Sequence, residues 1–551
     1  MLFGNHDRYD HLTLRIPTRM GVINSLEKFD AEFFSVPPKF CDIMDPRLRK
    51  LLEVCHEAVV DAGVVPKSIQ GSRTGVFVGV TDSDAGAITK RTRKRTNLYG
   101  VLGNESSMLA NRVSYTMDLN GPSLSVHTAC SSGFTAVHQA ILAIRAGLCD
   151  AAIVAGAQCN HDAVTSFMFH GLEMTSTDGK CRSFDAGADG FVRAEAVVAI
   201  YICKMHEAKR AYATLIHAAI NNDGYKEEGI SFPSRVQQEN VIRQVYDETG
   251  IDPLEVDYVE AHGTGTLVGD PQEMHAIMKV FCAGRSQPLL VGSVKSNMGH
   301  SEPVSGLCGL SKMVLSHTKG ILPANLHYNT PNPDIPALVD RRIRVVDKNQ
   351  QFKAKYVGLN SMGFGGTNVH ILLKFNNHET APPWVPSIPV ILLCSGRSNQ
   401  AVTHFLDQAL LDSKNQHFVK LLHELSKEAM PRHPFRGYVV IHSESMGINV
   451  HNTDPKESVW FIFTGMGSQW VGMFTNLIKF DAFNKSVDLS HNYLENINYN
   501  LRHVLKSAEP TILDAFKNAM VTINVFQEKK RETFLVLQMH TAVCTCSRSL
   551  T

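Results

Sequence analysis

The sequence has little net charge, no long apolar run and no apolar segment at its start. Its 54 Lys and Arg residues nearly balance 53 Asp and Glu residues, giving a formal net charge of +1, so no overall field attracts nucleic acid or acidic membranes. No apolar run approaches the roughly 20 residues that a membrane span requires. Residues 1–7 do not resemble the apolar core of a signal peptide. We expect a cytoplasmic protein with neither a membrane nor a nucleic acid as partner.

Paired cysteine motifs are also absent, although the chain has 12 cysteines. None forms a Cys-x-x-Cys pair, and Cys544 and Cys546, which lie close together, do not have the spacing of a zinc site. Scattered thiols of this kind indicate a reducing compartment. The pattern predicts no metal and no redox cofactor.

The chain is large enough for several cores, with 551 residues and 44% hydrophobic content, and its length predicts two to four domains. A helix is predicted to begin near Asp45, with Pro46 at the favoured first position; its inward residues are Leu48, Leu51, Leu52 and Cys55. Nearly continuous apolar runs predict buried strands that are covered on both faces; they span 74–80, 151–155, 196–203 and 289–294. These patterns alone indicate an α/β protein with buried sheets.

The most informative segment, residues 125–133, reads Ser-Val-His-Thr-Ala-Cys-Ser-Ser-Gly. It predicts a short strand that turns into a helix, with Leu124 and Val126 as buried strand positions and Cys130 at the corner. Helical spacing of apolar residues follows at Phe134, Val137, Ile141 and Ile144. A cysteine beside a helix N-terminus favours the thiolate, which is the nucleophile. A lone cysteine, however, is more often a small buried hydrophobe.

Two further segments place a histidine after a predicted strand. Residues 256–271 predict a strand that delivers His262 into a loop rich in glycine and threonine. Residues 289–312 predict a strand, a polar turn that contains Lys295 and His300, and a helix. One such histidine is more often structural, but two histidines beside a cysteine at a helix start point to nucleophilic catalysis.

These three segments resemble the active-site motifs of β-ketoacyl synthases, the condensing enzymes of fatty acid and polyketide synthesis. The resemblance covers about residues 25–375 and extends to further motifs in the same order: Met44-Asp45-Pro46-Arg47, Asn111-Arg112-Val113-Ser114-Tyr115, Asn120-Gly121-Pro122-Ser123, Ser183-Phe184-Asp185 and Gly363-Phe364-Gly365-Gly366-Thr367-Asn368. The residues at 193–196 and 296–303 are more similar to those of animal fatty acid synthase than to those of modular polyketide synthases.

The resemblance implies a thiolase-like fold with five layers in the order helix, sheet, helix, sheet, helix. It also implies that Cys130 accepts an acyl chain from a phosphopantetheine thioester and condenses it with a malonyl thioester, with loss of carbon dioxide. His262 and His300 would assist decarboxylation, and Lys295 would support them electrostatically.

The same resemblance assigns substrate contacts and partners. Thr264 and Thr266 would bond the pantetheine arm, and Phe364, beside Gly365, would gate the acyl pocket. Backbone N–H groups of Cys130 and of the loop 363–366 could hold the oxyanion. The implied partners are an acyl carrier protein and a second copy of the chain, with no cofactor bound directly. We expect structural hydrogen bonds or ion pairs from Glu273 and Glu302.

Three domains are expected along the chain. The condensing domain spans residues 1–375. A polar, proline-rich break then opens a small α/β linker domain, 376–457, with predicted strands at 388–394 and 438–442 and helices near 400–428. Residues 458–551 are similar to the start of a malonyl/acetyl transferase, in which Gln469 would help form the oxyanion hole. Because the chain contains no Gly-x-Ser-x-Gly motif, we expect this domain to be truncated, with an atypical tail from about residue 526.

Two departures from the family pattern stand out in the condensing segment. The strand that usually opens the family is replaced by a short polar tract, which would leave a sheet edge exposed. His127 stands where the family usually has aspartate, and we expect it to modulate activity without abolishing it.

Three other functions remain open at the level of sequence. The first is an iterative polyketide condensing unit, and the second is a non-catalytic fragment that docks a carrier protein or a full-length synthase. The third, thiolase-type degradation with free coenzyme A, fits poorly because that class usually pairs its nucleophile with a second cysteine.

Overall fold

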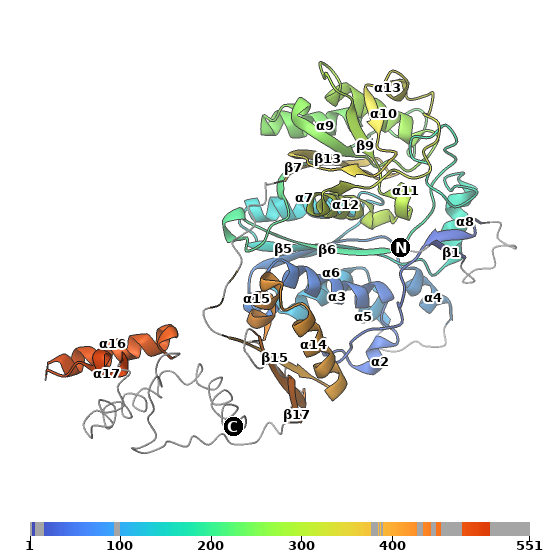
Figure 1. Cartoon of the computed structure of the whole chain (residues 1–551). Coiled ribbons are helices and arrows are strands. Elements are labelled where there is room, and N and C mark those ends of the chain that lie inside the picture. The colour runs from blue at the N-terminus through green and yellow to red at the C-terminus, as the bar shows by residue number, and fades with distance from the viewer. Residues whose placement is uncertain are drawn as a thin grey trace. The chain divides into compact units, whose positions relative to one another are not determined.

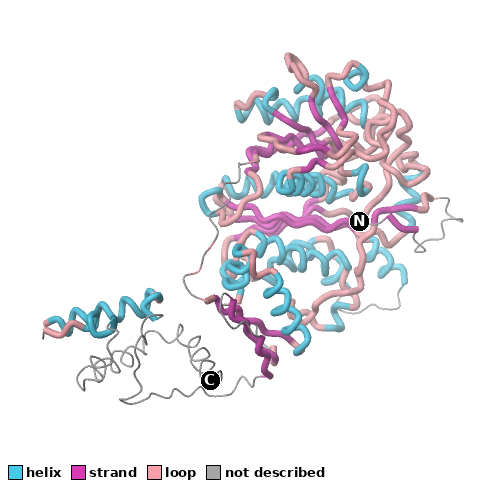
Figure 2. Tube along the Cα trace, in the orientation of Figure 1, coloured by secondary structure: helices cyan, strands magenta, loops and turns pink. Residues whose placement is uncertain are grey.

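Two mixed sheets with helices on their faces form the core of residues 1–379 in the computed structural model (Figures 1 and 2). The structure describes residues 3–5, 16–92, 100–375, 384, 386, 389–426, 433–441, 448–452, 477–496 and 498–506. Gln469 and the tail from residue 526 lie outside the described residues, as do most residues of the tract that precedes Ile16. A second unit comprises residues 380–551.

The first sheet has the strand order β4-β3-β5-β6. These strands are β3 (Thr74–Gly79), β4 (Ser123–Val126), β5 (Ala151–Gln158) and β6 (Ala196–Cys203). β3 is parallel to β4 and β5, with Val76 opposite Ser123 and Thr74 opposite Ala151, whereas β6 is antiparallel to β5.

The second sheet has the order β11-β9-β8-β13-β14-β7. Its strands are β7 (Thr214–Asn222), β8 (Val256–Glu260), β9 (Leu289–Gly292), β11 (Ile343–Val345), β13 (Tyr356–Met362) and β14 (Thr367–Lys374). β9, β8 and β13 run parallel and β14 runs antiparallel to β13. The run β4-β3-β5-β6 therefore matches β9-β8-β13-β14 in order and direction, so the two sheets repeat one arrangement of strands.

Helices complete the five layers that the resemblance implies. α3 (Pro46–Asp61) and α6 (Ser107–Met117) pack on the outer face of the first sheet, and α7 (Ser132–Arg145) and α12 (Ser305–Lys319) fill the space between the sheets. α9 (Arg235–Thr249) packs on the outer face of the second sheet, beside α10 (Gly269–Phe281). Figure 1 shows this succession of layers. Burial on both faces explains why every residue of β3 and β5 is buried.

The predicted burial is wrong for parts of two strands, β4 and β6, and both lie on sheet edges. Leu124 is 47% exposed and Val126 is half-buried because β4 is the edge strand at one side of the first sheet. On the other side, Ala196 alone among the residues of β6 is buried, and the others are half-buried. An apolar pattern indicates a strand but does not tell whether a neighbouring strand covers it.

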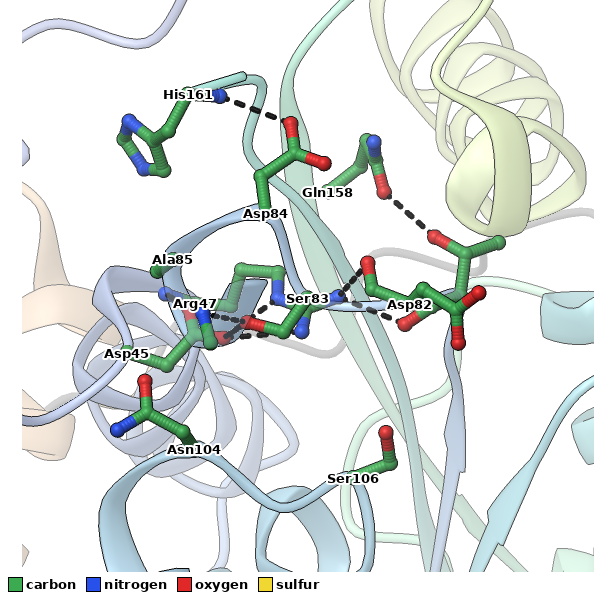
Figure 3. Close-up of polar contacts among 12 residues, drawn as sticks. Asp45, Arg47, Asp82, Ser83, Asp84, Ala85, Asn104, Ser106, Gln158 and His161 are labelled. Atoms are coloured by element: carbon green, nitrogen blue, oxygen red, sulfur yellow. Dashed lines mark hydrogen bonds and ion pairs between the residues drawn. The ribbon is translucent and has the colours of Figure 1, made fainter. Parts of the chain in front are cut away.

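The predicted helix at Asp45 is confirmed, and its start belongs to a buried polar network (Figure 3). The Asp45 side chain accepts from the Arg47 backbone N–H at 2.8 Å and forms an ion pair with the Arg47 guanidinium at 2.9 Å. Ser83 Oγ donates to the same carboxylate at 2.6 Å, and Arg47 donates to the carbonyl of Thr81 at 3.0 Å. Arg47 therefore connects the start of α3 to the loop after β3. Burial opposes ionisation of Asp45, but the Arg47 cation and these hydrogen bonds hold its pKa below the usual range.

We expect Asp45→Ala to lower the free energy of unfolding by about 3–5 kcal/mol, because it would leave the Arg47 cation buried without its partner. Urea unfolding of the full chain measures the change. The matched control is Asp150→Ala, since Asp150 pairs with Arg73 at 2.8 Å but both side chains are about half exposed. We expect that control to cost less than about 1 kcal/mol. Equal losses would contradict this account of the network.

Residues 380–551 contain a separate small sheet with the order β15-β16-β17. The strands are β15 (Val390–Gly396), β16 (Phe435–Ile441) and β17 (Ile448–Asn452), and the helices are α14 (Asn399–Leu411), α15 (Gln416–Leu425), α16 (Asp481–Glu495) and α17 (Leu501–Lys506). Leu392, Val402 and Val439 pack in its core. The strands and helices predicted between 388 and 442 are thus present. In the part of the chain that the structure describes, no helix is both long and apolar enough to cross a bilayer.

Candidate active site

Cys130 lies at a tight corner between β4 and α7. Ala129, just before it, has a left-handed φ of 54°, which a non-glycine residue adopts at an energetic cost. Ser132 Oγ donates to the Ala129 carbonyl at 2.6 Å and accepts from the Thr128 N–H at 2.9 Å, so the turn is closed by its own side chain. The strand–corner–helix prediction is confirmed, and Phe134, Val137 and Ile141 are buried as expected.

The corner is held by both halves of the domain. The carbonyl oxygen of Cys130 accepts from Ser305 Oγ at 3.2 Å and from Ser361 Oγ at 3.0 Å. Ser305 begins α12 and Ser361 lies in β13, so both hydroxyls come from the second half. These serines are positioning residues that sequence reasoning missed, because nothing in their local pattern connects them to Cys130.

The glycine-rich loop at 363–366 packs directly against the corner. A Cβ on Gly363 would lie 2.6 Å from the carbonyl oxygen of Thr128, so this approach requires glycine. The backbone N–H of Phe364 hydrogen-bonds toward the Cys130 sulfur, as does the N–H of Cys130 itself. Two backbone donors therefore lie beside the sulfur, where they could also reach the oxygen of a carbonyl group that becomes attached to it.

The prediction that Cys130 rests as a thiolate is wrong. Burial, followed by the nearby Glu302 carboxylate, raises the pKa of the Cys130 thiol to about 12, although Lys295 and the Phe364 N–H act in the opposite direction. The α-helix begins at Ser132, with Ser131 as its N-cap, so Cys130 precedes the first turn. The sulfur is a thiol at neutral pH, and its proton must leave as it attacks.

His262 follows β8 and is fixed through its own backbone and ring. Glu273, on α10, accepts from the N–H groups of His262 and Gly263 at 2.7 and 2.8 Å. The Met362 N–H donates to His262 Nδ1 at 3.3 Å. Since Nδ1 acts as the acceptor, the neutral ring carries its proton on Nε2 and can donate from there.

His300 lies beside His262, with the two ring centroids 5.4 Å apart and the rings perpendicular. The Phe191 ring packs edge-on against His300 at 5.1 Å. His300 Nδ1 is buried and has no hydrogen-bond partner among the described residues. Burial first, and then the Lys295 cation, hold the pKa of both histidines well below the usual range. Both imidazoles are therefore neutral at physiological pH.

Lys295 connects His262 to the buried charges around it. Its Nζ donates to the His262 carbonyl at 2.6 Å and lies 3.5 Å from His262 Nδ1. Burial lowers the pKa of Lys295, while Glu273 and Glu260 act to raise it.

The structural role expected for Glu302 is confirmed, because its carboxylate pairs with Arg193 Nε at 2.6 Å. The role expected for Glu273 is confirmed by its backbone contacts.

The two predicted pantetheine contacts lie in the loop after His262. The hydroxyl oxygens of Thr264 and Thr266 are 3.1 Å apart, and Thr266 Oγ1 also accepts from the Gly269 N–H at 3.2 Å. The buried carboxylate of Asp270 anchors the loop by accepting from the Gly265 N–H at 3.0 Å. Burial raises the pKa of Asp270 to about 7.

Phe364 and Gly365 lie at the open side of the site. The Phe364 side chain is 46% exposed, and its ring contacts the Phe169 ring edge-on at 6.4 Å. No atom lies within 4 Å of a Cβ placed on Gly365.

His127 is exposed, and its Nδ1 accepts from the Ala129 N–H at 3.4 Å. It therefore contacts the backbone of the corner that carries Cys130.

A buried polar chain behind His262 also escaped sequence reasoning. Asn360 donates to Glu273 at 2.9 Å, the His370 ring bonds the Asn360 oxygen at 2.6 Å, and Tyr246 bonds His370 at 3.1 Å. His370 lies in β14, the strand after the glycine-rich loop. The residues around it are mostly apolar, so nothing in the local sequence indicated a polar role for it. Among the described residues, no cluster of His, Cys, Asp and Glu side chains could hold a metal ion.

Comparison with known families covers most of the chain. The beta-ketoacyl synthase N-terminal domain matches residues 4–208, and the beta-ketoacyl synthase C-terminal domain matches residues 212–329. The ketoacyl-synthetase C-terminal extension matches residues 331–440, and the acyl transferase domain matches residues 460–534.

Similar proteins include both fatty acid and polyketide synthases. The chain is 47% identical over 306 residues to a fatty acid synthase of Anser anser anser, which covers 56% of this chain and 87% of that sequence. It is 35% identical over 533 residues to a phenolphthiocerol/phthiocerol polyketide synthase of Mycobacterium tuberculosis, covering 90% of this chain but 28% of that longer protein. Among solved structures, an oxazolomycin ketosynthase domain of Streptomyces albus superposes with a TM-score of 0.72 at 27% identity, covering 80% of each chain.

Proposed function

Because the chain belongs to the β-ketoacyl synthase family of fatty acid and polyketide synthases, we propose that residues 1–375 form a condensing domain that extends fatty acyl chains. The observation that carries this proposal is the placement of Cys130, His262 and His300 around Lys295, with backbone donors facing the sulfur. Identity of 47% with an animal fatty acid synthase supports the fatty acid assignment.

In the first half-reaction, the Cys130 sulfur attacks the carbonyl carbon of an acyl-phosphopantetheine thioester. The N–H groups of Cys130 and Phe364 stabilise the oxyanion, and loss of one such donor typically slows a reaction by about 10²–10³-fold. Because Cys130 starts as a thiol, its proton passes to the departing carrier thiol, with a neutral histidine as the relay. The products are acyl-Cys130 and the free thiol of the carrier.

In the second half-reaction, a malonyl thioester loses carbon dioxide and leaves an enolate. Nε2–H of His262 donates to the developing enolate oxygen, and His300 shares that role. Neutral imidazoles suit this step, since they donate a hydrogen bond without a net positive charge that would hold the carboxylate in place. The enolate carbon attacks the acyl-Cys130 carbonyl, and the Cys130 sulfur leaves as a thiolate that takes up a proton from water. The product is a β-ketoacyl thioester two carbons longer.

The test is to incubate the purified chain with hexanoyl-pantetheine and malonyl-pantetheine and to follow the products by mass spectrometry. We expect hexanoyl-Cys130, release of carbon dioxide and 3-oxooctanoyl-pantetheine. Folded protein that accepts the acyl group but never condenses it would overturn the condensing proposal. Folded protein that accepts no acyl group would favour the docking fragment described above.

A polyketide condensing unit is the second candidate, because the mycobacterial polyketide synthase matches 90% of the chain. Straight saturated acyl thioesters and α-methyl-β-hydroxyacyl thioesters separate the two functions. We expect at least ten-fold higher kcat/KM for the saturated chain, and the reverse preference would assign the domain to polyketide synthesis.

The carrier and the other domains complete the proposal. We propose that an acyl carrier protein presents both thioesters and that Thr264 and Thr266 bond the pantetheine arm. Phe364 gates the acyl pocket from its half-exposed position beside Phe169. Residues 376–457 would serve as the linker domain, and residues 458–551 as the start of an acyltransferase with Gln469 in its oxyanion hole. We propose a cytoplasmic location for the whole assembly.

A homodimer is expected to form through the edge strand β4, where Leu124 is 47% exposed. We expect Leu124→Lys to weaken the dimer at least ten-fold, because two copies would bring like charges together at the interface. Analytical ultracentrifugation over a dilution series measures the change. Leu254→Lys, at another partly exposed leucine, is the control. A wild-type monomer, or an unchanged dimer in the variant, would contradict this interface.

We expect Lys295→Met to move the acid limb of the pH–rate profile upward by about one pH unit. In the wild type, burial and the Lys295 cation keep the pKa of His262 and His300 low, so the rate stays flat as pH falls from 8 to 6.5. Without the cation both pKa values rise, and protonation removes neutral imidazole at a higher pH. Malonyl decarboxylation measured across pH tests this, with the exposed Lys279→Met as control. An unmoved acid limb would show that burial alone sets these pKa values.

A further inference from the structure

A buried ion pair in the second half has no part in the mechanism derived above. It joins Lys312 of α12 to Glu260, the last residue of β8, with 2.7 Å between Nζ and Oε2 and side chains that are 6% and 3% exposed. The Tyr258 hydroxyl donates to the same carboxylate oxygen at 2.9 Å and accepts from Lys312 at 3.1 Å. Apolar residues of similar volume often replace such a pair without loss of stability. Stability alone is therefore a weak reason for two charges at this place.

The backbone of β9 leaves room for this cluster. Gly292 ends β9 directly beside the Tyr258 hydroxyl, and a Cβ at position 292 would overlap the Tyr258 oxygen. This close approach requires glycine. Ser293 and Val294 follow and lead to Lys295, so the cluster lies at the start of the turn that carries this lysine.

The other oxygen of Glu260 binds this turn. The Val294 N–H donates to Glu260 Oε1 at 2.5 Å. The same turn also bonds His262, because Ser293 Oγ donates to the His262 carbonyl at 3.2 Å and Lys295 Nζ donates to it at 2.6 Å. The turn is thus held from two points, Glu260 and His262, that are only two residues apart in the chain.

We propose that Glu260 is a positioning residue, which holds the turn at 293–295 so that Lys295 Nζ stays in contact with His262. The other two members of the cluster fix the Glu260 carboxylate in the required orientation. The kinetic consequence rests on the proposed function: because Lys295 and His262 serve decarboxylation, loss of this anchor should slow that step. Acyl loading should suffer less, since its oxyanion is held by backbone N–H groups.

The charge of Glu260 and its hydrogen bond to the turn predict different behaviour. Burial lowers the pKa of Lys295, and four groups act to raise it: Glu273, Glu260, Cys130 and Cys181. Lys312 lies directly against Glu260, so its positive charge offsets much of the effect of this carboxylate on Lys295. An uncharged hydrogen-bond acceptor at position 260 should therefore serve as well as the carboxylate.

Two double variants separate the acceptor from the charges. Glu260→Met with Lys312→Met removes the acceptor for the Val294 N–H, whereas Glu260→Gln with Lys312→Met keeps it. Both remove the two charges and keep similar side-chain volumes. In hydrogen exchange of the full chain, we expect the amides at 293–296 to exchange at least ten-fold faster without the acceptor. With glutamine they should stay within three-fold of the wild type, and the amides of β3, in the other sheet, should be unchanged in both variants.

The same proteins give a kinetic result. Without the acceptor, we expect malonyl decarboxylation to fall at least ten-fold while acyl loading of Cys130 falls less than three-fold. Besides burial, the Lys295 cation holds down the pKa of His262 and His300. His300 also acts on His262, and Arg193 acts on His300. Displacement of Lys295 should therefore move the acid limb of the pH–rate profile upward, and glutamine should restore both the rate and the limb. A smaller amount of folded protein would lower both rates at every pH and would leave the limb in place.

Equal exchange at 293–296 in the two double variants would overturn the proposal, because the acceptor at position 260 would then make no difference. An equal loss of loading and decarboxylation would assign Glu260 to the general fold of the second half. A wild type that does not decarboxylate malonyl thioester would contradict the proposed function, and the exchange rates would still decide the role of Glu260.

Tyr258→Phe decides the question if the variant without the acceptor does not fold. It removes one contact to the carboxylate and keeps the ion pair between Lys312 and Glu260. We expect the amides at 293–296 to exchange at least three-fold faster in this variant, with the amides of β3 unchanged. Exchange at the wild-type rate would show that the cluster does not hold the turn.

Discussion

Cys130→Ala is expected to lose acyl loading and condensation together, with the rate reduced by roughly 10⁴–10⁶-fold, the range found when a catalytic nucleophile is removed. The sulfur is the atom that forms the thioester, and no other described cysteine is held at a strand–helix corner facing two backbone donors. Intact mass spectrometry after incubation with hexanoyl-pantetheine should show one adduct on the wild type and none on the variant.

Cys149→Ala is the matched control, since Cys149 is also a buried free thiol but packs in the core of the first half. We expect it to load as the wild type does. An adduct that persists in Cys130→Ala would place the nucleophile elsewhere. Loss of the adduct in both variants would point to general damage to the fold.

His300→Ala should separate the two half-reactions. We expect malonyl decarboxylation to fall by about 10²–10³-fold, as for loss of an oxyanion donor. Acyl loading of Cys130 should fall less than ten-fold, because its oxyanion is held by the backbone N–H groups of Cys130 and Phe364. Carbon dioxide release and acyl-enzyme formation, measured side by side on the same preparation, give the two rates.

The control for this substitution is His138→Ala. His138 is half-buried on α7 and, like His300, has a buried Nδ1 with no hydrogen-bond partner among the described residues. It should leave both half-reactions unchanged. An equal loss of loading and decarboxylation in His300→Ala would assign this histidine to the architecture of the site and not to the enolate.

The positions of strands and helices around the site could be predicted from local patterns. The strand–corner–helix at Cys130 and the helix capped by Asp45 depend on residues that lie close together in sequence. Hydrophobic periodicity and helix-capping patterns describe interactions over that short range. Family motifs then linked Cys130, His262 and His300, which lie far apart in sequence. The structure brings His262 and His300 into ring contact and places both, like Cys130, around Lys295.

Properties set by distant neighbours could not be predicted. Leu124 and β6 share the apolar pattern of core strands, but their exposure depends on whether another strand lies beside them. The position of Cys130 near a helix start suggested a thiolate, whereas burial beneath the loop at 363–366 and the charge of Glu302 favour the thiol. Desolvation depends on the assembled fold, so a local motif does not reveal its size.

The hydrogen bonds from Ser305 and Ser361 to the Cys130 carbonyl have a consequence for how activity is lost during denaturation. A nucleophile that is clamped by residues 175 and 231 positions away cannot keep its geometry when either half opens. Turnover should therefore disappear at the onset of partial denaturation, before most of the helical signal is lost. The rate of condensation therefore reports whether the two halves are packed together. A duplicated fold of this kind is active only when both halves are folded and in contact.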